Sequence, residues 1–573
     1  MSAARAASVA SWIFLAACLA HAGANLIFVA RYWWPLPFAD QQLWIEALYQ
    51  QGPWYALTRH LNEHRPVVPA FFYLVDWYLF QGRQAMLEVV VVAAQAGTFF
   101  YLVRPFLSGA IPPPAARMMI AIAAVWSTWL LQCENLCWPF EINFTLGNLS
   151  LIAAAWHGSR AWIAPAAASW TGALRQAIPA ALWATVGTFS LGNSALAWPL
   201  LAGFSLLERR GKLASIFTIA GAAVLLLHGA GHKPPAAGSI RPHPFDVVNF
   251  ALAFWARPAA PAWLFRSLRG QLHGNVRFSE MPWLWMVAAV IGALLFFFAF
   301  RYLLRRGRHR HTLFYLPLAI AIAVTGLLAG FTRAIYGVEV AFVSRYVTVQ
   351  WTLWFCLLAL VTLAVFRSPR APVIAFWAAA VVALALHTLP ANAEMGAFCR
   401  ERSVAMEQQA FAVRNGVFDE YAWSFIVFDA PRFRSSLDAM QRDGKNLFAT
   451  ALHTRFGEKL GNFEEAACDG AILGLRSIPT ASGVARAVNG WAWNRAESRE
   501  VEAIMLASPD DRSIIGSGLP GTMLIDQPAI TADRAKWNVG FMAHTRSAPV
   551  AEPFQVWARL GGYRYCKIGP VQP

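Results

Sequence analysis

Charged side chains are scarce in this chain of 573 residues, where Asp, Glu, Lys and Arg together make up only 14%. Hydrophobic residues make up 57%, and a water-soluble protein of this length cannot bury so much apolar surface. The sequence also lacks long-period repeats and low-complexity linkers, which argues against solenoid and disordered architectures. The composition therefore predicts a polytopic α-helical membrane protein followed by a soluble domain.

Acidic residues are fewer than basic ones, 31 against 47, and the formal net charge is +16. A nucleic-acid groove would need this charge on one surface, but the basic residues gather in short loops between apolar runs, at 208–212, 301–311 and 367–370. Such loops mark the cytoplasmic side of a membrane. We therefore expect a membrane protein with no nucleic-acid partner.

The apolar runs predict about eleven transmembrane helices. The first run is long, lacks a convincing cleavage site and is followed by further spans, so it is interpreted as a membrane helix rather than a signal peptide. The N-terminus is then cytoplasmic, and the chain after about residue 390 is extracytoplasmic. The predicted spans are 9–30, 84–103, 117–132, 139–156, 176–190, 194–207, 213–230, 283–300, 312–331, 346–366 and 371–389.

A change in composition near residue 390 predicts two domains. Residues 1–390 are expected to form the transmembrane domain, with long external loops at 31–83 and 231–282. Residues 391–573 are richer in charge and are expected to form an extracytoplasmic α/β domain. From about residue 474 the short, turn-separated runs predict an all-β, sandwich-like fold.

Cysteines are few, seven in all. Cys399, Cys468 and Cys566 lie in the predicted outer domain, where disulfides form, and all three cannot pair with one another. Cys133 and Cys137 form either a local disulfide or two thiols. No His or Cys pair stands near them, so no metal ligand is assigned; the sequence neither indicates a divalent metal or other cofactor nor excludes one.

The loop from Trp33 to Gly82 combines ionisable residues with many aromatic residues. Asp76 and the prolines of its second half make a crossing there unfavourable, so two interfacial helices are expected, at about 40–58 and 67–80. Charge held at a membrane surface is costly to desolvate. We interpret the loop as an active site on the outer face; the alternative is an interfacial loop with an aromatic belt.

The motifs of this loop resemble the GT-C superfamily of integral-membrane glycosyltransferases, in particular its dolichyl-phosphate-mannose mannosyltransferase-like members. Phe38-Ala39-Asp40-Gln41 follows the first span; next come His64-Arg65-Pro66, an apolar helix ending in Leu79-Phe80-Gln81-Gly82, and the second span. Gln41 stands where the family commonly has a second acid, and Arg65 where it has a proline. The resemblance covers roughly residues 1–210.

This resemblance implies a sugar transferred, with inversion, from a polyprenyl-phosphate-linked donor to an envelope glycan, lipid or protein acceptor. The reaction would take place on the outer face of a bacterial inner (plasma) membrane. Asp40 would be the catalytic base that takes the proton of the acceptor hydroxyl. Asp40 could equally be the N-cap of the following helix.

Further residues are candidates for binding the donor or the acceptor. His64 and Arg65 either bind them or form a cluster at the start of a helix, with Glu63 pairing Arg65. Glu134 and Glu141 are either second acids or interhelical hydrogen-bond partners. Arg333 and Arg345 either bind the donor phosphate or reach lipid headgroups.

Two regions outside the first loop are candidates for substrate contact. The basic, aromatic loop 231–282 is either a lid over an anionic lipid carrier or an interfacial helix. Trp491 and Trp493 alternate on one predicted strand, where they either stack on a glycan or belong to the core. Other functions stay open: a transporter or flippase, a non-catalytic glycan-binding scaffold, and an acyltransferase or O-antigen-ligase-like enzyme.

Overall fold

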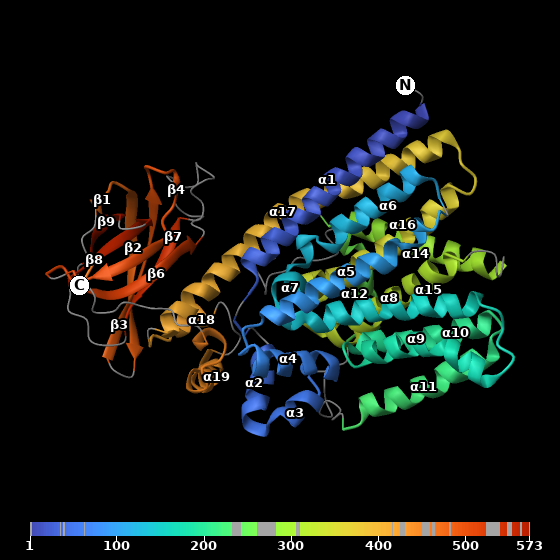
Figure 1. Ribbon diagram of the computed structural model, residues 1–573, viewed down its shortest axis with the longest axis horizontal. Helices are drawn as coiled ribbons and strands as arrows, with labels where there is room; N and C mark the ends of the chain where they lie inside the picture. The colour runs from blue at the N-terminus through green and yellow to red at the C-terminus, as the bar shows by residue number, and fades with distance from the viewer. Residues whose placement is uncertain are drawn as a thin grey trace. The chain divides into compact units, whose positions relative to one another are not determined.

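The computed structural model describes residues 3–34, 36–37, 40–61, 64–109, 111–231, 242–260, 282–304, 310–414, 416–424, 430–449, 459–460, 464–480, 483–510, 512–522, 539–546, 553–561 and 564–571. The chain divides into two compact units (Figure 1). Unit 1 comprises Met1–Arg31, Pro53–Leu74 and Met86–Gly396, and unit 2 comprises Tyr32–Gly52, Val75–Ala85 and Ala397–Pro573.

Unit 1 is built from helices. The long ones are α1 (Ala3–Tyr32), α5 (Ala85–Leu107), α6 (Pro113–Ser127), α8 (Ile142–Ile163), α9 (Trp170–Thr188), α10 (Ala197–Leu207), α11 (Gly211–Gly229), α12 (Pro244–Ala256), α14 (Pro282–Leu304), α15 (Thr312–Arg333), α16 (Val347–Val365) and the first part of α17 (Ala371–Arg414). Shorter ones are α3 (Pro53–Thr58), α4 (Val67–Leu79), η1 (Leu130–Gln132), α7 (Cys133–Cys137), η2 (Pro139–Glu141), η3 (Gly192–Leu196), η4 (Arg257–Ala259), η6 (Ala334–Tyr336), η7 (Val338–Phe342) and η8 (Ser344–Tyr346).

Eight helices among the described residues are long and apolar enough to cross a membrane. This agrees with the expectation of a polytopic helical membrane protein. The other three predicted spans coincide with α8, α9 and α10, and α10 has only 11 residues, too few for a perpendicular crossing. The total of about eleven spans stays a prediction.

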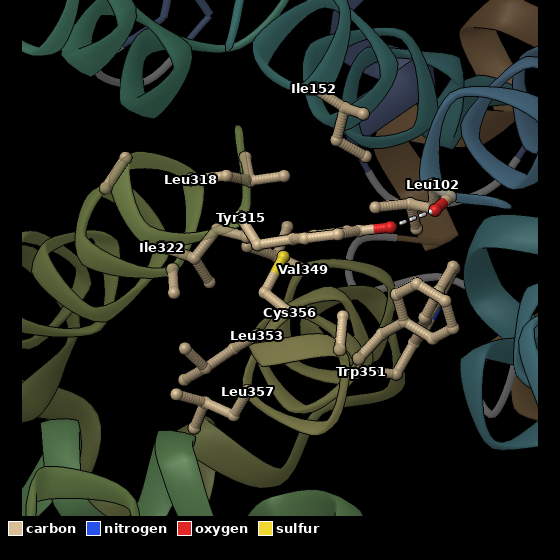
Figure 2. Packing of buried hydrophobic residues seen from close by; sticks show 14 of the residues in the cluster. Leu102, Ile152, Tyr315, Leu318, Ile322, Val349, Trp351, Leu353, Cys356 and Leu357 are labelled. Carbon is tan, nitrogen blue, oxygen red and sulfur yellow. Dashed lines mark hydrogen bonds between the residues drawn. The ribbon is translucent and has the colours of Figure 1, made fainter. Parts of the chain in front are cut away.

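The core of unit 1 is apolar and lies between α5, α8, α15 and α16 (Figure 2). Buried aliphatic side chains such as Ile152 and Leu353 pack around the ring of Tyr315, whose hydroxyl donates to the carbonyl oxygen of Leu102 at 2.6 Å. The hydroxyl would be costly to bury without this acceptor. Elsewhere in unit 1, α1 and α17 run side by side, and Asn392 hydrogen-bonds His21 across them (Figure 1).

The segment expected to be the first external loop forms the predicted helices with one difference. The segment expected at about 40–58 breaks into α2 (Asp40–Gln51) and α3, because Gly52 adopts a φ of +85° and Pro53 begins the next helix. The second helix, α4, ends before Gly82, which has a φ of +70°. Pro69 does not break α4, since the first turn of a helix tolerates proline.

The structure adds detail at two places where the sequence gave only approximate boundaries. Part of the predicted loop 231–282 is a helix, α12, which buries Phe250 and Phe254 one turn apart. The remainder of that predicted lid, residues 232–241 and 261–281, lies outside the described residues. The helix that contains the predicted span 371–389, α17, continues through Pro390 to Arg414.

Unit 2 combines the end of α17 with α2, α18 (Glu420–Ser424), α19 (Ala430–Arg442), η9 (Asn446–Phe448) and a sheet (Figure 1). The strands are β1 (Glu464–Glu465), β2 (Asp469–Thr480), β3 (Gly483–Asn494), β4 (Arg499–Glu500), β5 (Ala503–Ala507), β6 (Ile514–Thr522), β7 (Gly540–Thr545), β8 (Phe554–Gly561) and β9 (Arg564–Val571). Strand-rich structure was expected here.

The strands form one hydrogen-bonded order, β1-β9-β8-β5-β6-β7-β3-β2, with β4 paired to β3. All pairs are antiparallel except β1 with β9. The sheet curves so that β2 contacts β9, and Ile472 and Ile568 pack against one core with Val488 and Val556. A disulfide joins Cys468 to Cys566, whereas Cys399, Cys133 and Cys137 are buried thiols.

Candidate functional site

Asp40 is the first residue of α2 in unit 2, and its side chain is half-buried. A carboxylate at this position is stabilised by the unpaired N–H groups of the first helical turn. The next residue, Gln41, is buried, and its Nε2 donates to Oε1 of Gln84 at 3.0 Å. The backbone N–H of Gln84 in turn donates to Oδ2 of the buried Asp76 at 3.0 Å. The amide of Gln41 therefore ties α2 to the segment after α4.

Aromatic rings stand beside this hydrogen-bonded chain. Trp77 makes edge contacts with Trp44 at 6.3 Å and with Tyr49 at 5.9 Å between ring centroids. Burial, followed by the nearby charge of Asp443, raises the pKa of Tyr49. Aromatic neighbours thus hold the ring of Trp77 in place, eight residues before Ala85, where α5 begins.

His64 and Arg65 lie in unit 1 beside the C-terminal end of α11. Arg65 donates from Nη1 to the carbonyl oxygen of Leu227 at 2.6 Å and from Nε to that of Thr58 at 2.9 Å. The imidazole Nδ1 of His64 accepts the backbone N–H of Gly192 at 3.1 Å. Arg65 thus caps a helix end, a favourable place for a cation. Glu63, its expected ion-pair partner, lies outside the described residues.

Three of the predicted residues come together in unit 1: Glu134, Glu141 and Arg345, called here the carboxylate–arginine cluster. Arg345 Nε lies 3.5 Å from Glu134 Oε2, and its Nη1 lies 3.5 Å from Glu141 Oε1. The side chain of Arg345 is 31% exposed and that of Glu134 17%, whereas that of Glu141 is only 3% exposed. With all three groups ionised, the cluster carries one net negative charge.

Backbone contacts fix the geometry of the cluster. The N–H of Arg345 donates to Glu134 Oε2 at 3.2 Å, and the N–H of Glu134 donates to Ser344 Oγ at 3.2 Å. The reciprocal bonds hold α7 against η8, which leads directly into α16. The guanidinium therefore has a defined position at the start of a membrane-length helix.

Arg257, which the sequence grouped with the predicted lid, is instead fully buried in η4. Its Nε donates to the carbonyl oxygen of Phe342 at 2.9 Å, and its guanidinium lies 5.6 Å from the centre of that ring. Burial lowers the pKa of Arg257, and the nearby Cys133 opposes this effect. The apolar run Pro244–Ala256 just before it was the signal that this residue belongs to the interior.

The other predicted site residues, Arg333, Trp491 and Trp493, are not members of the carboxylate–arginine cluster. Arg333 is the half-buried last residue of α15. In unit 2, Trp493 is only 6% exposed and packs with Val539 and the half-buried Trp491. The burial of Trp493 favours the core alternative over stacking on a glycan.

No group of three or more His, Cys, Asp or Glu side chains in the described part of the chain is placed to hold a metal ion. Neither a protein-family model nor a curated protein sequence matches this chain.

Proposed function

We propose that this protein is a GT-C-type glycosyltransferase that moves a sugar from a polyprenyl-phosphate-linked donor to an envelope glycan, lipid or protein acceptor. The observation that carries the proposal is the carboxylate–arginine cluster, where Arg345 is held between Glu134 and Glu141 but stays 31% exposed. Burying three charged side chains among membrane-length helices costs free energy. We therefore favour a functional role for these residues over a purely structural one.

Arg345 is the proposed contact for the donor phosphate. A planar guanidinium forms two parallel hydrogen bonds to a phosphate, and holding it in place beforehand reduces the entropy lost on binding. Arg257 adds a second positive charge close to the same segment, which offsets the net negative charge of the cluster. Arg333 is kept as a further candidate for the phosphate.

Asp40 is the proposed base for the acceptor hydroxyl, on the strength of the motif resemblance. A single displacement with one base inverts the anomeric carbon, and the phosphate leaves without needing a strong acid. The buried Gln41–Gln84–Asp76 chain supports this role, because it holds the start of α2 in place. His64 and Arg65 are then positioning residues, since Arg65 caps α11.

The proposed arrangement has about eleven spans, a cytoplasmic N-terminus and an extracytoplasmic C-terminal domain in a bacterial plasma membrane. The basic loops support this orientation. The disulfide between Cys468 and Cys566 supports it independently, because disulfides persist in oxidising compartments outside the cytoplasm.

The test is turnover by the purified full-length protein reconstituted in lipid. Synthetic undecaprenyl-phosphate-linked hexoses and pentoses are supplied one at a time with an envelope lipid extract, and consumption of each donor is followed by mass spectrometry. Wild type should consume at least one donor. Asp40→Asn should lower the rate by about a hundredfold or more, as expected for loss of a general base. Arg345→Lys should lower kcat/KM by about tenfold or more, because lysine cannot bind a phosphate with two parallel bonds.

Glu46→Gln is the matched control, a carboxylate on the same helix whose Oε1 accepts from Gln50 at 3.1 Å. It should keep wild-type turnover. No donor consumption by wild type, or undiminished consumption by a folded Asp40→Asn protein, would contradict the proposal.

A second candidate, a transporter, is favoured by one observation. Buried polar side chains meet between membrane-length helices: Gln95 on α5 donates to Gln132 at 3.1 Å, and Thr348 on α16 donates to the same oxygen at 2.5 Å. Polar contacts of this kind line substrate and ion sites in transporters. Movement of a polyprenyl-phosphate sugar across the bilayer without chemical change would support this candidate over the transferase.

A further inference from the structure

Next to the carboxylate–arginine cluster lies a group of neutral polar side chains, Gln95, Gln132, Asn135 and Thr348, called here the amide node. They come from four elements, α5, η1, α7 and α16, and each is at most 4% exposed. Asn135 joins the node to the cluster, because its Nδ2 donates both to Thr348 Oγ1 and to the carbonyl oxygen of Arg345, each at 2.7 Å.

The orientation of each amide follows from its partners. Gln132 Nε2 donates to the carbonyl oxygens of Trp126 and Ser127, which can only accept, so its Oε1 faces the node. That oxygen accepts from Gln95 Nε2, Thr348 Oγ1 and Trp351 Nε1. The nitrogens of Gln95 and Asn135 are therefore committed to the node, and their oxygens are left over.

The polar atoms of these amides that have no partner in the described part of the chain are all oxygen atoms, which can only accept hydrogen bonds. Gln95 Oε1 and Asn135 Oδ1 are buried and accept no hydrogen bond from the described residues. One turn further along α16, Thr352 accepts from Asn148 Nδ2 at 3.2 Å, and Asn148 Oδ1 is likewise buried without a donor. A buried acceptor without a donor destabilises the folded protein unless a bound molecule or ion interacts with it. Only a donor or a cation can do so, and an anion is excluded.

The backbone of this region favours a cation as the partner of these oxygens. The chain between α6 and α8 is broken into η1, α7 and η2, and nearly all of it is buried. Short, broken helices inside membrane bundles typically place oxygens around ions.

We propose that the leftover oxygens of the amide node bind a dehydrated monovalent alkali cation, sodium or potassium. Neutral amide, hydroxyl and carbonyl oxygens suit such hard ions, whereas a divalent ion would require carboxylates, and those of the cluster already face Arg345. The site does not depend on the proposed transfer reaction. It would stabilise the bundle at the segment that carries Arg345.

The test is binding of radioactive sodium to the purified full-length protein in lipid nanodiscs. Wild type should bind sodium at a saturable site from which unlabelled sodium or potassium displaces it and choline does not. Gln95→Met, which keeps the side-chain shape without the amide, and Thr348→Val should weaken binding by at least about tenfold. Thr325→Val is the matched control, since that buried threonine donates to the carbonyl oxygen of Ala321 in its own helix and to no other described residue.

Thermal unfolding provides a second measurement that needs no variant. At constant ionic strength, replacing choline by sodium should raise the Tm of wild type in a saturable way, because a ligand of the folded state stabilises it. Absence of displaceable sodium binding, as expected for a node filled by water alone, would overturn the proposal. So would equal binding by wild type and folded Gln95→Met.

Discussion

Two buried carboxylates of this protein face guanidinium groups, one in each unit. Glu141 lies beside Arg345 in unit 1, and in unit 2 Asp419, at the start of α18 and 1% exposed, accepts from both terminal nitrogens of Arg476. The hydrogen bond that Arg476 donates to Asp419 raises the pKa of Arg476, and burial acts in the opposite direction. Nε2 of the buried His544 lies 3.4 Å from the same carboxylate. The first pair is partly exposed and is assigned to function, and the second connects α18 to β2 and β7.

Asp419→Asn should destabilise the protein. The change leaves Arg476 without its ionised acceptor and disturbs His544, and the expected loss is about 2 kcal/mol after discounting for the exposure of Arg476. Thermal unfolding followed by near-UV circular dichroism measures it. Asp469→Asn, whose carboxylate is 3.9 Å from the exposed Arg495, is the control and should change stability by less than about 0.5 kcal/mol.

The sequence located single residues better than it located their partners. Arg345, Glu134 and Glu141 were each predictable as costly charges near membrane spans. Their meeting was not, because 211 residues separate Glu134 from Arg345. Gln41 looked like a lost acid, and only the structure shows the hydrogen bond from its amide to Gln84.

Helix ends decide much of the structure at the scale of elements. The carbonyl groups at the end of α11 are satisfied by Arg65, and His60 Nε2 lies 3.0 Å from the carbonyl oxygen of His228 in the same turn. Arg210, in a loop that the sequence assigns to the cytoplasmic side, donates to Trp162 and Ala164 at the end of α8. Basic residues at these helix ends therefore stabilise the helices as well as favouring one orientation of the chain in the membrane.

Arg65→Ala should lower stability by about 1 kcal/mol, because the last carbonyls of α11 and that of Thr58 lose their donor. A lower Tm with an unchanged KM for the donor is the expected result. Arg175→Ala, on the exposed side of α9, is the control and should leave Tm unchanged. A normal Tm together with a strongly raised KM would instead place Arg65 on the substrate.

Apolar periodicity predicted every long helix of unit 1 except α12. The break between α2 and α3 could also have been predicted locally, from the adjacent Gly52 and Pro53. The continuation of α17 through Pro390 was not predictable from composition, because residues 397–414 are polar enough to be soluble and still pack on a sheet: Gln408 Nε2 donates to the carbonyl oxygen of Leu519 at 2.7 Å. Strand order was equally out of reach, since it depends on contacts far apart in sequence.

At the scale of the whole molecule, the account depends on which side of the membrane each part faces. Basic loops, a single disulfide and the motif resemblance all favour a donor reached from the same side as the C-terminal domain. The roles proposed for Asp40 and for Arg345 each require that the residue faces that side.

Turnover by oriented proteoliposomes tests this claim most directly. Vesicles are sorted by whether protease removes the C-terminal domain from outside, and undecaprenyl-phosphate-linked sugar is added to the outer leaflet only. The account predicts donor consumption by vesicles whose C-terminal domain faces outward, and none by those of opposite orientation. Consumption only in the opposite orientation, or in neither, would contradict it.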